Sequence, residues 1–262
     1  MKARVVSPLF EYVLRLADND LVLAQRLGVW AGKGPVLEED IALTNVGLDL
    51  LGQARLWLAY ASEIEALHNG RGRSEDELAF LRDASAFRNL LLAEQPNGNY
   101  ADTMARQFYF DQWHRLVLDV LSLSTDARIA EIAGKAAKEV AYHVERSADW
   151  VIRLGDGTAE SNRRMQSAID DLWMYTGEMF APDAIELALI ETGIAADVRK
   201  LHDRWLVNVR GVLDEATLSL PTGVWMQGGA ERGGKQGVHT EHLGHMLAEM
   251  QFLPRAYPGL QW

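Results

Sequence analysis

The sequence predicts an all-α fold, a four-helix bundle with one long crossover connection and extra helices at its C-terminal end. Apolar residues recur at steps of three and four along several long segments, which is the period of an amphipathic helix. Turn-forming residues separate these segments, and none shows the alternating pattern of a strand bounded by hairpin turns. The chain has 262 residues, enough to bury a large core, and we expect one domain over residues 1–262.

The first two core helices are expected at about residues 9–30 and 38–67. Glycine and proline at residues 32–35 end the first helix. Acidic residues at 38–40 begin the second, where the positive end of the helix dipole favours them, and residues 69–70 (Asn-Gly) close it. Because the connection is short, the two helices should lie antiparallel as a hairpin.

The other two core helices are expected at about residues 100–123 and 126–154. They are joined by a tight turn in which Thr125 or Asp126 can cap the second of them. The less regular residues 71–99 separate this hairpin from the first, and we interpret them as a long crossover. Two long helical hairpins with one long connection are the arrangement of a ferritin-like four-helix bundle.

Residues 158–262 are expected to add further helices, a loop and a C-terminal helix. A glycine-rich stretch at residues 221–237 predicts that the loop is flexible. The helical patterns of this region cover about residues 160–180, 183–191, 197–218 and 240–253.

Composition and charge exclude several classes of protein. The 37 Asp and Glu residues outnumber the 26 Lys and Arg residues, and the net charge of −11 disfavours nucleic acid as a partner. The chain has no cysteine, so disulfides, thiolate zinc sites and iron–sulfur clusters are excluded. No apolar run reaches the roughly 18 residues of a membrane span and no signal-peptide pattern is present, so we expect a cytoplasmic protein without a membrane partner.

Ferritin-like oxygenases have a characteristic ligand spacing. They hold two irons between the core helices, with one carboxylate from each of two helices and a Glu-x-x-His pair from each of the others. Residues three apart lie on one helical face, so both members of a pair can reach the same metals. Within the predicted bounds of the second and fourth core helices, residues 38–67 and 126–154, no such pair occurs.

Four sequence blocks are specific when taken together: residues 17–27 (ADNDLVLAQRL), 45–55 (NVGLDLLGQAR), 94–103 (EQPNGNYADT) and 239–251 (HTEHLGHMLAEMQ). In this order they closely resemble the family of C subunits of the bacterial ring-1,2-phenylacetyl-CoA epoxidase. The resemblance covers nearly the whole chain, which is far more specific than one short motif.

The resemblance implies that the di-iron ligands of metal-competent relatives are lost here. Those relatives look like they carry Asp-Glu-Leu-Gly-His where this chain has DLLGQ at 49–53, and Glu-Arg-Tyr-His where it has VAYH at 140–143. Asp20 and Asp111 are the best matches to the single carboxylates, with Gln107 as a rival to Asp111. The vestigial di-iron positions are therefore Asp20, Leu50, Gln53, Asp111, Val140 and His143.

We therefore expect no catalytic, cofactor-binding or metal-binding residue in this chain. Two glutamates are replaced by apolar side chains and one histidine by an amide, so too few anionic ligands remain to offset two cations in a buried site. The retained polar side chains should be satisfied by each other, by Gln53 or by a cation such as Lys138.

The resemblance implies a structural, non-catalytic subunit of a multicomponent oxygenase. The complex would convert phenylacetyl-CoA to its ring-1,2-epoxide, with the di-iron centre in a catalytic A subunit, a small B subunit, and a reductase component that takes electrons from NADPH. This chain would pair with the A subunit and stabilise it. Whether two copies of the chain also associate is left open.

Two alternatives are kept. The chain could itself be a catalytic di-iron oxygenase, or it could bind a metal through His239, His242 and His245, which should fall on one helical face. In a structural subunit, the same histidines would serve packing or contact between subunits. Trp225 and Trp262, in a loop and in the tail, are expected as aromatic anchors for a partner.

Overall fold

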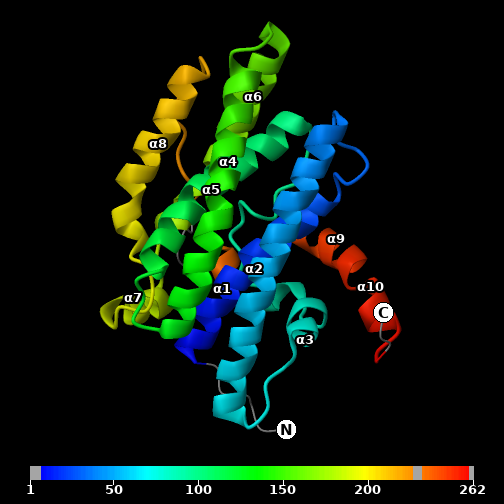
Figure 1. Cartoon of the computed structure of the whole chain (residues 1–262), viewed down its shortest axis with the longest axis vertical. Helices are drawn as coiled ribbons and strands as arrows, with labels where there is room; N and C mark the ends of the chain where they lie inside the picture. Colours follow the sequence, from blue (N-terminus) through cyan, green and yellow to red (C-terminus); the bar gives the residue numbers. More distant parts are fainter. Residues whose placement is uncertain (1–6, 227–231, 260–262) are drawn as a thin grey trace. The chain divides into compact units, whose positions relative to one another are not determined.

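The computed structural model describes residues 7–226 and 232–259, and these residues form ten α-helices, four short 3₁₀ helices and no strand (Figure 1). The prediction of an all-α fold is confirmed. The chain divides into two compact units, one made of residues up to Gln95 together with those from Arg232, the other of the residues between them. Whether the two units together form a single domain over residues 1–262, as predicted, stays a prediction.

The first unit is built on the helical hairpin of α1 (Pro8–Gly28) and α2 (Leu37–Asn69), which lie side by side in Figure 1. The Ser7 side chain accepts a hydrogen bond from the N–H of Phe10 and caps α1. Gly70 closes α2 with φ of 77°, a left-handed conformation that favours glycine. The predicted helices 9–30 and 38–67 are thus confirmed, with ends that differ by one or two residues.

The first unit also contains the short helices α3 (Glu75–Phe80), α9 (Glu241–Met250) and α10 (Phe252–Ala256). The predicted single helix at about 240–253 is therefore wrong, because the chain forms two helices that meet at Gln251. Pro254 has no N–H to donate to the carbonyl four residues earlier, which explains why α9 does not continue.

The prediction of a flexible loop over residues 221–237 is wrong for part of that range. Residues 227–231 lie outside the described residues, but residues 232–237 are packed and contain a 3₁₀ helix, Gly234–Gln236. A Cβ atom on Gly234 would lie 1.9 Å from the carbonyl oxygen of Asn89, and one on Gly237 would lie 2.2 Å from that of Ser85. The glycines of this stretch therefore allow two backbone segments to pack closely, which is a structural role for glycine.

The second unit is built on the hairpin of α4 (Tyr100–Leu121) and α5 (Ala127–Gly155), as predicted for residues 100–123 and 126–154. The carboxylate of Asp126 accepts hydrogen bonds of 3.0 Å from the N–H groups of Arg128 and Ile129, so Asp126 is the N-cap of α5. The two hairpins and the crossover between them follow the order of elements of the ferritin-like fold class.

The other elements of the second unit are shorter than predicted. The predicted helix at about 160–180 is α6 (Ala159–Trp173) followed by a 3₁₀ helix, because Trp225 packs so closely on Gly177 that a Cβ atom there would lie 2.6 Å from its ring. The predicted helix at 197–218 is a 3₁₀ turn followed by α8. The remaining elements are the 3₁₀ helix Thr176–Phe180, α7 (Ala184–Glu191), the 3₁₀ helix Val198–Leu201 and α8 (His202–Glu215).

Candidate functional site

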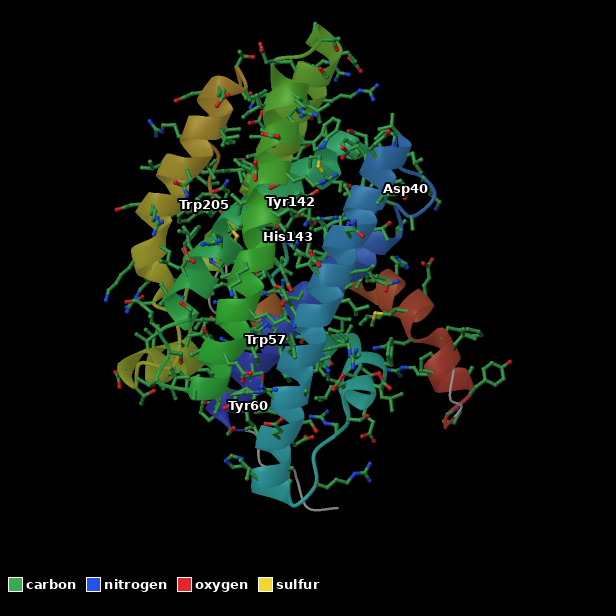
Figure 2. The ribbon with its side chains drawn as sticks, viewed as in Figure 1. Asp40, Trp57, Tyr60, Tyr142, His143 and Trp205 are labelled. Atoms are coloured by element: carbon green, nitrogen blue, oxygen red, sulfur yellow. The ribbon has the colours of Figure 1, made fainter. Side chains whose placement is uncertain are left out.

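The second unit holds a cluster of buried polar side chains on α4 and α5. Asp111 on α4 and His143 on α5 are each 1% exposed. Figure 2 labels His143. Burial raises the pKa of Asp111 from 3.8 to about 6, against the opposing effects of His143, a hydrogen bond from Ser147, and Arg146. Asp111 is therefore a carboxyl group that changes charge near neutral pH.

Two buried arginines accompany Asp111. The Nη2 group of Arg106 donates to the side-chain oxygen of Asn97 at 2.9 Å, and that of Arg146 donates to the hydroxyl of Tyr100 at 3.1 Å. Arg106 is 0% and Arg146 8% exposed, and both lower the pKa of Asp111 by their positive charge. The environment of Asp111 in this unit is thus positively charged, which opposes the binding of a cation.

These arginines correct one prediction made from the sequence. Lys138 is exposed, so it does not satisfy the retained polar residues of the core. No sequence pattern marks Arg106 or Arg146, because an arginine within a helix is normally solvated. Only the tertiary structure identifies them as buried.

His114 lies one turn after Asp111 on α4 and is 4% exposed. Burial, together with the nearby His143, lowers its pKa to about 3. The ring packs against Phe110, with ring centroids 5.1 Å apart. His114 is therefore a neutral core residue at physiological pH.

The vestigial positions in the first unit are also buried. Asp20 on α1 is 1% exposed, and Leu50 and Gln53 on α2 are 0% and 2% exposed. In the second unit, Val140 on α5 is 0% exposed. Leu50 and Val140 offer no donor atom, so the two positions where metal-competent relatives are expected to have glutamate are part of the apolar core.

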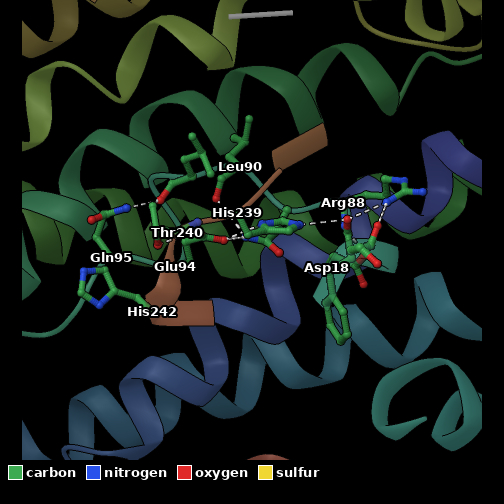
Figure 3. Close-up of polar contacts among 12 residues, drawn as sticks. Asp18, Arg88, Leu90, Glu94, Gln95, His239, Thr240 and His242 are labelled. Carbon is green, nitrogen blue, oxygen red and sulfur yellow. Dashed lines mark hydrogen bonds and ion pairs between the residues drawn. The ribbon is translucent and has the colours of Figure 1, made fainter. Parts of the chain in front are cut away.

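A second polar network joins the crossover to the C-terminal segment of the first unit (Figure 3). Glu94 is 0% exposed, and its Oε1 atom accepts from the N–H of Thr240 at 2.6 Å and from the hydroxyl of Thr240 at 2.8 Å. Its Oε2 atom accepts from Asn89 at 2.9 Å and lies 2.7 Å from Nδ1 of His239. The Nε2 atom of His239 lies 3.1 Å from the carbonyl oxygen of Phe87, so both ring nitrogens face acceptors.

A buried ion pair lies in the same unit. Arg82 donates to Asp18, whose Oδ2 atom also accepts from the N–H of Arg88 at 2.8 Å. Asp18 is 0% exposed and the side chain of Arg82 is 3% exposed. Arg82 also lies over the ring of Phe87 at 4.2 Å, which stabilises the guanidinium further. No sequence signal reveals this pair, because its members are 64 residues apart.

The sequence pattern of the phenylacetic acid catabolic protein family matches residues 1–262. The chain belongs to this family. A curated relative from Escherichia coli (strain K12), the C subunit of 1,2-phenylacetyl-CoA epoxidase, is 52% identical over 257 residues. The match covers 98% of this chain and 100% of the relative. The resemblance stated from the four sequence blocks is confirmed, and with it the all-α, ferritin-like fold class.

Two of the vestigial positions in this chain offer no ligand atom to a di-iron centre. Leu50 and Val140 supply no ligand atom, and Arg106 and Arg146 bring positive charge close to Asp111. Among residues 7–226 and 232–259, no group of three or more His, Asp or Glu side chains is placed to hold a metal ion. No helix within the same residues is long and apolar enough to cross a membrane.

The histidine prediction is wrong in its geometry. His239 precedes α9 and its side chain is 4% exposed against Glu94, whereas His242 and His245 lie on α9. The three histidines therefore do not share one helical face. His242 is half-buried and its carbonyl accepts from Arg26 at 3.2 Å, while His245 is exposed.

The two tryptophans predicted as partner anchors have different outcomes. Trp225 is 41% exposed and packs against Gly177 and His202. The centroids of the Trp225 and His202 rings are 5.4 Å apart. A role of Trp225 in contact with a partner stays a prediction. Trp262 lies outside the described residues.

Proposed function

We propose that this chain is the C subunit of a 1,2-phenylacetyl-CoA epoxidase, and that it acts as a structural, non-catalytic subunit. The epoxidase role is supported by the identity of 52% over 98% of the chain to the C subunit from E. coli. The non-catalytic role depends on one observation above all. The apolar side chains of Leu50 and Val140, both 0% exposed, stand where a di-iron site needs carboxylates.

In this proposal the di-iron centre belongs to a catalytic A subunit. A small B subunit and a reductase component that uses NADPH complete the complex, which operates in the cytoplasm. The contribution of this chain is to bind the A subunit and stabilise its fold. No step of the oxygenation is assigned to Asp20, Asp111 or His143.

Two buried polar contacts connect elements of the first unit, as a structural role requires. Asp18 and Arg82 fix the crossover to α1, and Glu94 with His239 fixes the start of α9 to the crossover. Because an alternative packing would leave these buried groups without their partners, we infer that the two contacts favour one arrangement of the first unit.

Reconstitution tests the proposal. The A subunit, the B subunit and the reductase are assayed for phenylacetyl-CoA-dependent NADPH oxidation and epoxide formation, with and without this chain. We expect epoxide formation only with the chain present, and unchanged activity when His143→Ala replaces the wild type. Full activity without the chain, or loss of activity with a folded His143→Ala variant that still binds the A subunit, would contradict the proposal.

A further inference from the structure

Helix α2 is apolar on two opposite faces. One face packs into the core of the first unit through buried residues that include Leu43, Val46 and Leu50. The other face carries Leu37, Ile41, Leu48 and Leu51, which are 71%, 52%, 59% and 40% exposed. A row of exposed apolar side chains of this kind marks a surface that a partner can cover.

The four exposed side chains lie on one face of the helix, with Thr44 in the turn between Ile41 and Leu48. Steps of four, seven and three residues place them within one face of an α-helix, and the stripe from Leu37 to Leu51 is about 21 Å long at 1.5 Å per residue. We call residues 37–52 the α2 stripe. A helix of a second protein could contact it over about four turns.

Gly52 lies on the same face, one turn after Leu48. Glycine weakens the middle of a helix, and it is usually explained by a neighbouring group for which a side chain leaves no room. A Cβ atom on Gly52 would meet nothing within 4 Å in this chain. By contrast, a Cβ atom on Gly47, on the buried face, would lie 3.5 Å from the Leu27 side chain. Close approach of a partner helix would account for Gly52.

The charge around the stripe indicates what kind of partner fits. No Lys, Arg or His occurs between Lys33 and Arg55, whereas Glu38, Asp40 and Asp49 lie in this part of α2. Two copies of the chain would bring the same acidic segments together, in a protein with a net charge of −11. A helix with an apolar stripe flanked by Lys or Arg would be complementary.

We propose that the α2 stripe is the surface that binds the catalytic subunit, through an α-helix of that subunit whose apolar stripe has a basic rim. This inference rests on the proposed function. It names the surface on this chain and the chemistry of its occupant. The vestigial positions Leu50 and Gln53 face the opposite side of α2 and take no part in the contact.

Co-expression of the full chain with a tagged A subunit tests the inference. The amount of this chain recovered per A subunit is measured for the wild type, for Leu48→Asp and for Leu67→Asp. Leu67 is the matched control, because it is 85% exposed on the same helix but lies outside the stripe. Circular dichroism and the thermal midpoint of each isolated chain show whether the variant is folded.

Burying an uncompensated carboxylate in an apolar interface weakens binding by about a hundredfold. We therefore expect Leu48→Asp to reduce recovery at least about tenfold at expression concentrations, and Leu67→Asp to match the wild type within about twofold. Glu38→Lys tests the basic rim separately. It should slow association at low salt, and the difference from wild type should shrink in 0.5 M salt, roughly the condition in which surface charges are screened.

The outcomes separate the inference from the proposed function. If the wild-type chain is not recovered with the A subunit, the proposed function itself fails. If the wild type and Leu48→Asp are recovered equally, the stripe is not the contact, although the proposed function stands. If the isolated chain is a dimer that Leu48→Asp converts to a monomer while recovery with the A subunit is unchanged, a second copy occupies the stripe and the inference is overturned.

Discussion

Removal of Glu94 should strongly destabilise the first unit. Its carboxylate is 0% exposed and accepts hydrogen bonds from Thr240 and Asn89, and it lies against His239. In Glu94→Ala these donors lose their acceptor inside the protein. His239 loses the carboxylate that faces its Nδ1 atom.

The expected loss of stability follows from these contacts. Each donor left buried without an acceptor costs about 1 to 3 kcal/mol, so losing the contacts to Thr240 and Asn89 should cost about 3 to 5 kcal/mol in all. Glu94→Gln keeps the shape and one acceptor oxygen for Thr240, so its cost should be smaller, about 1 to 2 kcal/mol. For a domain of ordinary stability, roughly 5 to 15 kcal/mol, this loss is a large share of the free energy of unfolding.

Urea unfolding and amide hydrogen exchange measure the two parts of this effect. The free energy of unfolding should fall by the amounts given, and exchange over α9 should quicken in Glu94→Ala because Thr240 begins that helix. Glu241→Ala is the control, since Glu241 is exposed on α9 and its loss should change stability by less than about 0.5 kcal/mol. If Glu94→Ala lost no more than Glu241→Ala, the argument for this network would be refuted.

Three further predictions concern other residues. The pKa of Asp111 is raised from 3.8 to about 6 in the folded chain, so the folded state holds its proton more tightly and stability should fall by roughly 2 kcal/mol as pH rises from 4 to 6. Urea unfolding at each pH should show this slope reduced in Asp111→Asn, and equal slopes in the two proteins would contradict the prediction. Gly237→Ala should destabilise by about 1 kcal/mol or more, because φ is 77° and a Cβ atom would lie 2.2 Å from a carbonyl oxygen. In Gly244→Ala on α9 the new Cβ atom meets nothing within 4 Å, so this variant should be more stable by about 0.5 to 1 kcal/mol. If the thermal midpoints of both variants moved in the same direction, this pair of predictions would be wrong. Asp18→Ala should cost about 3 to 5 kcal/mol by leaving Arg82 buried without its carboxylate, and a loss below 1 kcal/mol in urea unfolding would show that the pair is not needed.

The sequence predicted the parts of the fold that local chemistry determines. Asp126 caps α5 and Gly70 closes α2 because both depend on residues within one turn of the chain. The end of α6 was not predictable in this way. It depends on the ring of Trp225 lying against Gly177, a contact made 48 residues along the chain, and no local pattern indicates that contact.

In the candidate site, too, residue types could be interpreted from the sequence, whereas contacts between distant residues could not. The loss of ligands at Leu50, Gln53 and Val140 stays a prediction from the resemblance, which needs only the residue types. The partners of the retained residues could not be inferred, because Arg106 and not Lys138 is buried with Asp111. His239 was placed on a helical face by its spacing, but Glu94, 145 residues away, holds it before the helix begins.

The iron content of the purified chain shows whether this subunit has an iron centre of its own. The purified full chain is loaded anaerobically with ferrous iron, loosely bound metal is removed, and iron per chain is measured together with protein concentration. A subunit without a di-iron site should hold far less than one iron per chain, and His143→Ala should give the same value. A content of about two irons per chain, lost in the folded His143→Ala variant, would contradict this prediction and would make this chain a di-iron protein.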